Sequence, residues 1–97
     1  MSIELLGTKK LEKAATMLKV MAHPIRLAII DLLGVNSKMN VTEIYEALSI
    51  EQAAASHHLT LLKSKGLLSS ERDGKNCVYF LKHDRITQIV SCIEKCN

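Results

Sequence analysis

The chain has 97 residues, which is the size of one domain and is too short for a catalytic domain joined to a regulatory one. Hydrophobic residues make up 47% and charged residues 24%, so the composition predicts a folded chain and excludes disorder. A formal net charge of +3 permits binding to a polyanion without requiring it. We expect one domain over residues 1–97 with a core of aliphatic side chains and a majority of helix, because aromatic residues are only 3%.

The sequence carries no signal for a membrane or for secretion. No N-terminal segment has a basic start followed by a long apolar stretch, and no run approaches the roughly 18 apolar residues of a membrane span. The three cysteines, Cys77, Cys92 and Cys96, form neither an even set nor a Cys-x-x-Cys pair. We therefore expect a soluble, cytoplasmic protein with reduced thiols.

The first two predicted elements are helices. Residues 9–21 carry a broad apolar stripe at helical spacing, which near a chain end favours packing on both the protein's own core and a partner subunit. The stripe consists of Leu11, Ala14, Ala15, Leu18 and Met21, widened by Met17 and Val20. His23 and Pro24 then start a second helix, because proline suits the first helical position. This helix is almost entirely apolar, and Gly34 is expected to end it, so we expect it to be the central buried helix.

Two shorter helices are predicted next. Residues 35–39 are expected to form a loop, after which Asn40 can cap a third helix with Glu43 at the capping-box position. A fourth helix follows after a turn of about three residues, covers roughly residues 51–65, and is closed by Gly66. Two helices joined by so short a turn predict a helix-turn-helix.

The apolar period changes from helical to two after Gly66. Residues 67–72 and 76–81 flank Asp73-Gly74, a strong hairpin signal because the tight turn needs a positive φ, so a two-stranded ribbon is expected. Cys77 shares a strand face with apolar neighbours and is expected to pack there. Asp84 can start a last helix, whose apolar face consists of Ile86, Ile89, Val90 and Ile93. This order predicts a mostly α fold with a small β-hairpin, the winged helix-turn-helix.

The non-core face of the fourth helix carries the candidate DNA contacts. They are Gln52, Ala53, Ser56, His57, Thr60 and Lys63. Gln can pair with adenine through two hydrogen bonds, Ser and Thr can bind a base or a phosphate, and an Ala methyl can contact a thymine methyl. A solvated helix face often has such residues, but the absence of acidic residues after Glu51 until Gly66 favours a surface that faces phosphates.

The hairpin adds Arg72 and Lys75 near its tip, where Asp73 is explained by turn geometry. We interpret these as wing contacts to the DNA backbone. The alternative is a winged-helix module that binds a protein partner and little DNA. An enzyme is disfavoured, because Ser56, His57 and the cysteines form no constellation of nucleophile, base and orienting carboxylate.

Three stretches carry a resemblance to a known family. They are residues 22–30, residues 54–59 followed by Leu62 and residues 66–68, and the hairpin residues 72–75 leading to residues 79–81. Over most of its length the chain resembles the ArsR/SmtB family of bacterial winged-helix repressors. The resemblance implies a homodimer joined through the first and last helices, a two-fold symmetric DNA operator and release by an inducer. It also implies that His58 lies toward the core rather than toward DNA.

The chain departs from the family pattern around the turn between the third and fourth helices. Tyr45 stands where the family favours Ala, and Ser49 stands where it favours a turn Gly, which predicts a turn that is slightly opened or strained. Glu51 replaces the usual Ser at the start of the fourth helix, and its carboxylate would repel a phosphate.

The family's sensor sites are incomplete in this sequence. Members that sense soft metals have a Cys pair where this chain has residues 39–42, which contain no ligand. Members with a zinc-type site between the last helices have ligands where this chain has His83, Arg85 and Cys96, and Arg85 cannot ligate, which leaves the site broken unless Cys92 substitutes. No metal ion or other cofactor is therefore expected. Cys92 and Cys96, four residues apart on one helical face, are the candidate thiol switch.

Overall fold

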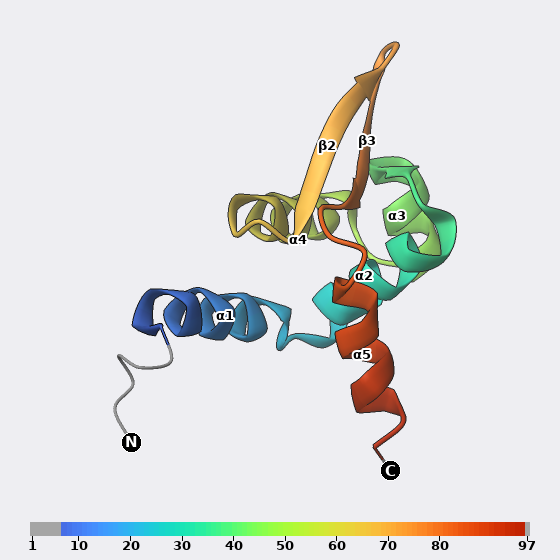
Figure 1. Cartoon of the computed structure of the whole chain (residues 1–97). Coiled ribbons are helices and arrows are strands. Elements are labelled where there is room, and N and C mark those ends of the chain that lie inside the picture. Colours follow the sequence, from blue (N-terminus) through green and yellow to red (C-terminus); the bar gives the residue numbers. More distant parts are fainter. Residues whose placement is uncertain (1–6, 97) are drawn as a thin grey trace.

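The computed structural model describes residues 7–96 of the chain. Within them, five helices form a body from which a β-hairpin projects (Figure 1). In chain order the elements are α1 (Thr8–Met21), α2 (Pro24–Asn36), β1 (Met39–Asn40), α3 (Val41–Leu48), α4 (Gln52–Ser64), β2 (Leu68–Asp73), β3 (Asn76–Leu81) and α5 (Ile86–Glu94). This is the winged helix-turn-helix order, so the predicted fold class is confirmed.

Side-chain caps specify two of the helix starts, as the sequence predicts. His23 precedes α2, and its Nδ1 accepts a hydrogen bond from the backbone N–H of Ile25 at 3.2 Å, while Pro24 occupies the first turn. At α3, Oδ1 of Asn40 accepts from the N–H of Glu43 at 2.8 Å, and the Glu43 carboxylate accepts from the N–H of Asn40 at 2.9 Å. Each cap contributes about 1 kcal/mol to helix stability and fixes where the helix begins.

The end of α2 differs from the prediction. Gly34 does not end the helix, which continues to Asn36 before Ser37 adopts a φ of 65°. A Cβ atom on Gly34 would lie 2.6 Å from Cγ2 of Thr87, so this glycine permits the close approach of α5 to α2. The predicted loop over residues 35–39 is correspondingly too long.

The sheet has three strands where the sequence predicts a two-stranded ribbon. The additional strand, β1, consists of Met39 and Asn40 and pairs antiparallel with β3, which gives the order β1-β3-β2. Two residues are too few to show the alternation of apolar and polar side chains by which a strand is predicted. The extra pairing anchors the base of the hairpin to the segment between α2 and α3.

The hairpin turn lies one residue later than predicted. Asp73 pairs with Asn76, so the two turn residues are Gly74 and Lys75, and Asp73 belongs to β2. Gly74 has a φ of 66°, the positive value that the prediction required of the turn glycine. A two-residue loop with glycine first matches the right-handed twist of the strands, and the two strands stay paired up to the tip of the wing.

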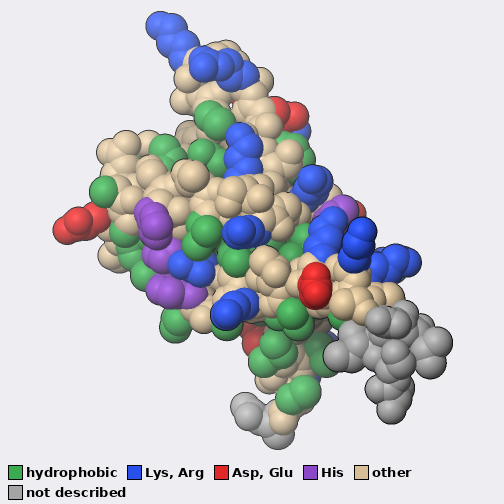
Figure 2. Space-filling view, turned by 90° about the vertical axis from the view of Figure 1, so that its left-hand side faces the viewer, with side chains coloured by type: hydrophobic (Ala, Val, Ile, Leu, Met, Phe, Trp, Pro, Cys, Tyr) green, Lys and Arg blue, Asp and Glu red, His purple; other side chains and the backbone are tan. Residues whose placement is uncertain are grey.

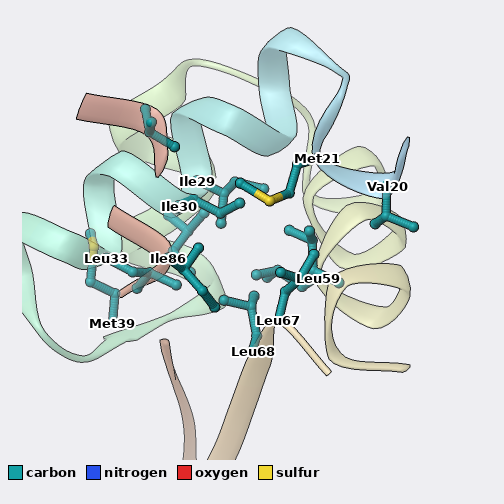
Figure 3. Close-up of a cluster of buried hydrophobic side chains, with 13 residues drawn as sticks. Val20, Met21, Ile29, Ile30, Leu33, Met39, Leu59, Leu67, Leu68 and Ile86 are labelled. Atoms are coloured by element: carbon teal, nitrogen blue, oxygen red, sulfur yellow. The ribbon is translucent and has the colours of Figure 1, made fainter. Parts of the chain in front are cut away.

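The hydrophobic core lies between α2, α4, α5 and the start of β2 (Figure 3). Ile29, Ile30 and Leu33 are each at most 2% exposed, which confirms α2 as the central buried helix. The other elements contribute Val20, Met21, Met39, Ile44, Leu59, Leu62, Leu67, Leu68, Ile86 and Val90. Because each buried Leu or Ile contributes about 1.5–3 kcal/mol, this cluster sets the orientation of α4 on the body.

Among residues 7–96, the large apolar side chains that are exposed lie on α1 and α5, apart from Val35 on α2. Figure 1 shows α5 pointing away from the wing and α1 reaching sideways beyond α4. The residues are Leu11 (42% exposed) and Leu18 (50%) on α1, and Ile89 (40%) and Ile93 (61%) on α5. Val20 and Met21 are buried, so the broad stripe predicted on the first helix is divided between the protein's own core and an exposed face.

Candidate nucleic-acid interface

A closed three-residue turn sets α4 against α3. The N–H of Ser49 donates to the carbonyl oxygen of Glu46 at 3.3 Å, and the N–H of Ile50 donates to that of Tyr45 at 3.1 Å. Ser49 has φ 54° and ψ 44°, the left-handed conformation that glycine adopts most easily. Of the two outcomes predicted for this turn, the structure shows strain at Ser49, and the turn is not opened.

The inner face of α4 is fixed by the core. Ala55, Leu59 and Leu62 are fully buried, and His58 is 8% exposed, as the family resemblance predicts for this histidine. Since buried positions recur every three to four residues, the helix has one face locked inward and the opposite face free. The rotation of α4 about its axis is therefore determined.

All six residues predicted as DNA contacts on α4 lie on its outer face. Each of them is exposed, namely Gln52, Ala53, Ser56, His57, Thr60 and Lys63. Ser56 and Thr60 are four residues apart, as are Ala53 and His57, so these side chains are neighbours in two adjacent rows. The rows present hydroxyl, imidazole and methyl groups, which are short enough to reach base edges when a helix enters the major groove, about 12 Å wide in B-DNA.

Glu51 begins α4 as its N-cap residue. Its side chain makes no capping hydrogen bond and is exposed, so the first turn of α4 has no side-chain acceptor for its free N–H groups. Helix N-termini attract anions such as phosphate through these N–H groups. The exposed Glu51 carboxylate lies at this helix start, and its repulsion of a phosphate stays a prediction.

The wing carries the other two predicted contacts. Arg72, near the end of β2, and Lys75, in the hairpin turn, are both exposed. Figure 2 shows Lys and Arg side chains at the tip and spread over the face below it. Arg and Lys in such positions bind phosphates and position a protein on the duplex without reading the bases.

The base of the wing is braced by a residue that the sequence prediction missed. The Lys38 ammonium donates a hydrogen bond to Oε1 of Glu71 on β2 and lies 5.5 Å from the ring centroid of Phe80 on β3. Both partners of the ion pair are about half exposed, so it contributes at most about 1 kcal/mol. Lys38 and Glu71 are 33 residues apart, and no local pattern in the sequence links them.

The three cysteines are all exposed and reduced. The prediction that Cys77 packs within the sheet is wrong, because it lies near the tip end of β3, beyond the reach of the core. Burial, and then the neighbouring Cys77 thiol, raise the pKa of the Tyr79 phenol. Cys92 lies on α5, but the helix ends at Glu94, before Cys96, so the prediction that the two share one helical face is wrong. Cys92 borders an apolar depression that Ile89 and Ile93 also line.

Residues 7–96 contain no group of three or more His, Cys, Asp or Glu side chains placed to hold a metal ion. In the same part of the chain, no helix combines the length and the apolar character required to cross a bilayer.

Comparison with known proteins places this arrangement in a class. Residues 21–71, which include α2, α3, α4 and part of the wing, match the family described as helix-turn-helix domain. An uncharacterized HTH-type transcriptional regulator of Methanocaldococcus jannaschii, MJ1325, is 34% identical over 90% of this chain and 98% of its own length. The protein is thus a helix-turn-helix transcriptional regulator, a class that binds duplex DNA in a sequence-specific manner.

Solved structures narrow the class to a family. The crystal structure of the transcriptional repressor PagR of Bacillus anthracis superposes with a TM-score of 0.82 at 32% identity, covering 89% of this chain and 98% of PagR. The winged helix-turn-helix domain of Mb0332 from Mycobacterium bovis, a possible ArsR-family regulator, gives 0.80 at 28% identity over 90% and 80%. The chain belongs to the ArsR/SmtB family of winged-helix transcriptional regulators.

Proposed function

We propose that the outer face of α4 is the DNA-reading surface and that the wing holds the neighbouring backbone. The observation that carries this proposal is the exposure of all six outer residues on a helix whose inner face is locked into the core. In this assignment Gln52 pairs with adenine, Ala53 contacts a thymine methyl, and Ser56, His57 and Thr60 bind bases or phosphates. Lys63, Arg72 and Lys75 bind phosphates.

The working unit in this proposal is a homodimer joined through α1 and α5. Leu11, Leu18, Ile89 and Ile93 are large apolar side chains that are exposed on these two helices. Exposed apolar surface of this kind favours association with a partner. The Mb0332 domain is described as homodimeric, which supports the same assembly here. Two α4 helices would then contact half-sites about 34–36 Å apart on one face of the duplex.

The proposed action is repression in the cytoplasm, relieved when an inducer alters the dimer. PagR is described as a transcriptional repressor, and an operator covered by a dimer is inaccessible to polymerase. Cys92 and Cys96 are the candidate thiol switch, because both are exposed and Cys92 adjoins the proposed dimer face. Oxidation or modification of these thiols would add polar groups at an apolar interface.

Duplex binding tests the reading surface. A duplex is first selected from a randomised library by binding to the wild type. It is then titrated at two salt concentrations with wild type and with Ser56→Ala/His57→Ala. The control is His83→Ala, which replaces an exposed histidine before α5. We expect the double variant to lose about 100-fold in affinity, since each lost base contact costs about 1–3 kcal/mol, and the control to bind as wild type.

The salt series separates this function from the alternative. Phosphate contacts make affinity fall steeply with salt, with a slope that follows their number. A folded dimer that binds no duplex at low salt would contradict the proposal and favour the protein-interaction module.

A further inference from the structure

Arg26 lies where three helices meet. Its Nε donates a hydrogen bond to Nδ1 of His58 at 3.2 Å, and its Nη1 donates to the backbone carbonyl oxygen of Val20 at 3.0 Å. Val20 is in the last turns of α1, Arg26 is in the first turn of α2, and His58 is on the inner face of α4. The guanidinium group of Arg26 therefore links α1, the central helix α2 and the proposed DNA-reading helix α4.

His58 is the buried member of a histidine cluster, and histidines group at one edge of the face in Figure 2. Its ring centroid lies 4.7 Å from that of His23, which caps α2, and 5.5 Å from that of His57, on α4 itself. These two histidines and Arg26 are the titratable and charged groups that act on it, and the backbone carbonyl of Val20 on α1 accepts from Arg26. Within residues 7–96, no carboxylate pairs with Arg26 or with any of these histidines.

The hydrogen bond between Arg26 and His58 requires a neutral imidazole. A guanidinium only donates, so Nδ1 of His58 must carry a free lone pair and the ring proton must be on Nε2. A protonated imidazole donates from both nitrogens, so it loses this bond and places a second positive charge beside Arg26. Burial, followed by His23, Arg26 and His57, lowers the pKa of His58 from its ordinary value of 6.5.

We propose that Arg26 and His58 are positioning residues whose two hydrogen bonds, from Arg26 to His58 and to Val20, form a tie between α4 and α1. Protonation of His58 breaks this tie and weakens DNA binding as the pH falls. The inference rests on the proposed function of α4 and adds a regulatory property to it. Because α1 carries part of the proposed dimer surface, the tie joins the surface that holds the partner subunit to the surface that reads DNA. When the hydrogen bond between Arg26 and His58 is lost, the angle between these two surfaces is no longer fixed.

The sign of the effect follows from the neutral state that the fold favours. The tie is complete at pH values above about 6.5 and is lost as the pH falls through the lowered pKa of His58. A positive charge on His57 would act in the opposite direction, because this residue is exposed on the outer face, where positive charge attracts phosphates. The two effects are separated by testing His58 in a His57→Gln background.

The experiment measures affinity for the library-selected duplex by fluorescence anisotropy, at constant ionic strength, between about pH 8 and about pH 5, where histidine titrates. In His57→Gln, we expect affinity to fall about five- to tenfold across this range, the lower end of typical coupling between sites. Adding His58→Asn should flatten the profile, because Oδ1 of Asn can accept from Arg26 and cannot be protonated. The matched control, His57→Gln/His83→Asn, should keep the fall.

A pH-independent affinity in His57→Gln, or an unchanged fall after His58→Asn, would overturn the proposal. Nitrogen NMR of the DNA-free protein gives a second, independent readout. We expect an unprotonated Nδ1 on His58 at neutral pH, and a change in the Nε–H signal of Arg26 as His58 protonates. If wild type bound no duplex at any pH, the proposed function would fail. The NMR titration would still decide whether the tie exists and whether it is lost as the pH falls. A proton on Nδ1 of His58 at neutral pH would exclude the tie.

Discussion

The backbone at Ser49 closes the turn between α3 and α4 in a conformation that a serine adopts at a cost. The left-handed conformation costs a residue other than glycine roughly 1–2 kcal/mol. Replacement by glycine removes this cost, but the greater freedom of glycine in the unfolded chain offsets part of the gain in stability. We predict that Ser49→Gly raises the free energy of unfolding by about 0.5–1 kcal/mol, measured by urea denaturation.

Ser64 provides the matched control for this substitution, because it is an exposed serine with helical geometry at the end of α4. Ser64→Gly should lower stability, since glycine is disfavoured in a helix. Equal destabilisation by both substitutions would show that Ser49 is not strained.

The residues on the exposed outer face of α4 could be predicted from the sequence because they depend on one helix alone. Once Ala55, Leu59 and Leu62 define the inner face, helical geometry determines the outer one. The bond between Arg26 and His58 was not predictable in the same way. Its partners are 32 residues apart, and their meeting depends on how α2 packs against α4.

At the scale of elements, the helices and the three-residue turn between α3 and α4 were predictable, whereas β1 and the end of α2 were not. The long apolar periods of residues 9–21 and 24–33 and the caps at His23 and Asn40 identify helices from local pattern. β1 has no such pattern, because two residues become a strand only through pairing with β3. The predicted end of α2 was wrong for a related reason. Gly34 permits the close approach of α5, and the sequence alone does not distinguish such a glycine from one that ends a helix.

The crossing of α2 and α5 gives a prediction at this scale. Gly34→Ala places a Cβ atom 2.6 Å from Cγ2 of Thr87, so we expect a loss of about 1–2 kcal/mol despite the better helix propensity of alanine. Thr87→Ser removes Cγ2 and keeps the hydroxyl that donates to the Asp84 carbonyl oxygen. In the Thr87→Ser background, Gly34→Ala should become neutral or stabilising.

Thermal unfolding of the four proteins in this cycle measures the coupling directly. Additive effects of Gly34→Ala and Thr87→Ser would contradict the assignment of Gly34 to helix packing. In that case Gly34 would be required only for the backbone conformation of α2.

For the whole molecule, three surfaces lie on separate parts of the fold. The proposed reading face is on α4, the basic tip is on the wing, and the exposed apolar side chains proposed to contact a second copy are on α1 and α5. The core holds α4 between the other two surfaces, so in the proposed dimer a change in packing can reach the proposed reading face through contacts such as that of Arg26 with Val20. This arrangement suits a regulator whose DNA affinity responds to events away from the DNA.

Hydroxyl-radical and base-interference footprinting on the selected duplex tests whether a dimer reads DNA through its two α4 helices. We expect two protected major-groove segments, related by two-fold symmetry and separated by about one helical turn, 10–10.5 base pairs. Ser56→Ala/His57→Ala should remove the base interference from both segments together. A single unsymmetrical segment, or base interference that persists in the double variant, would contradict the assignment of α4 as the reading helix of a dimer.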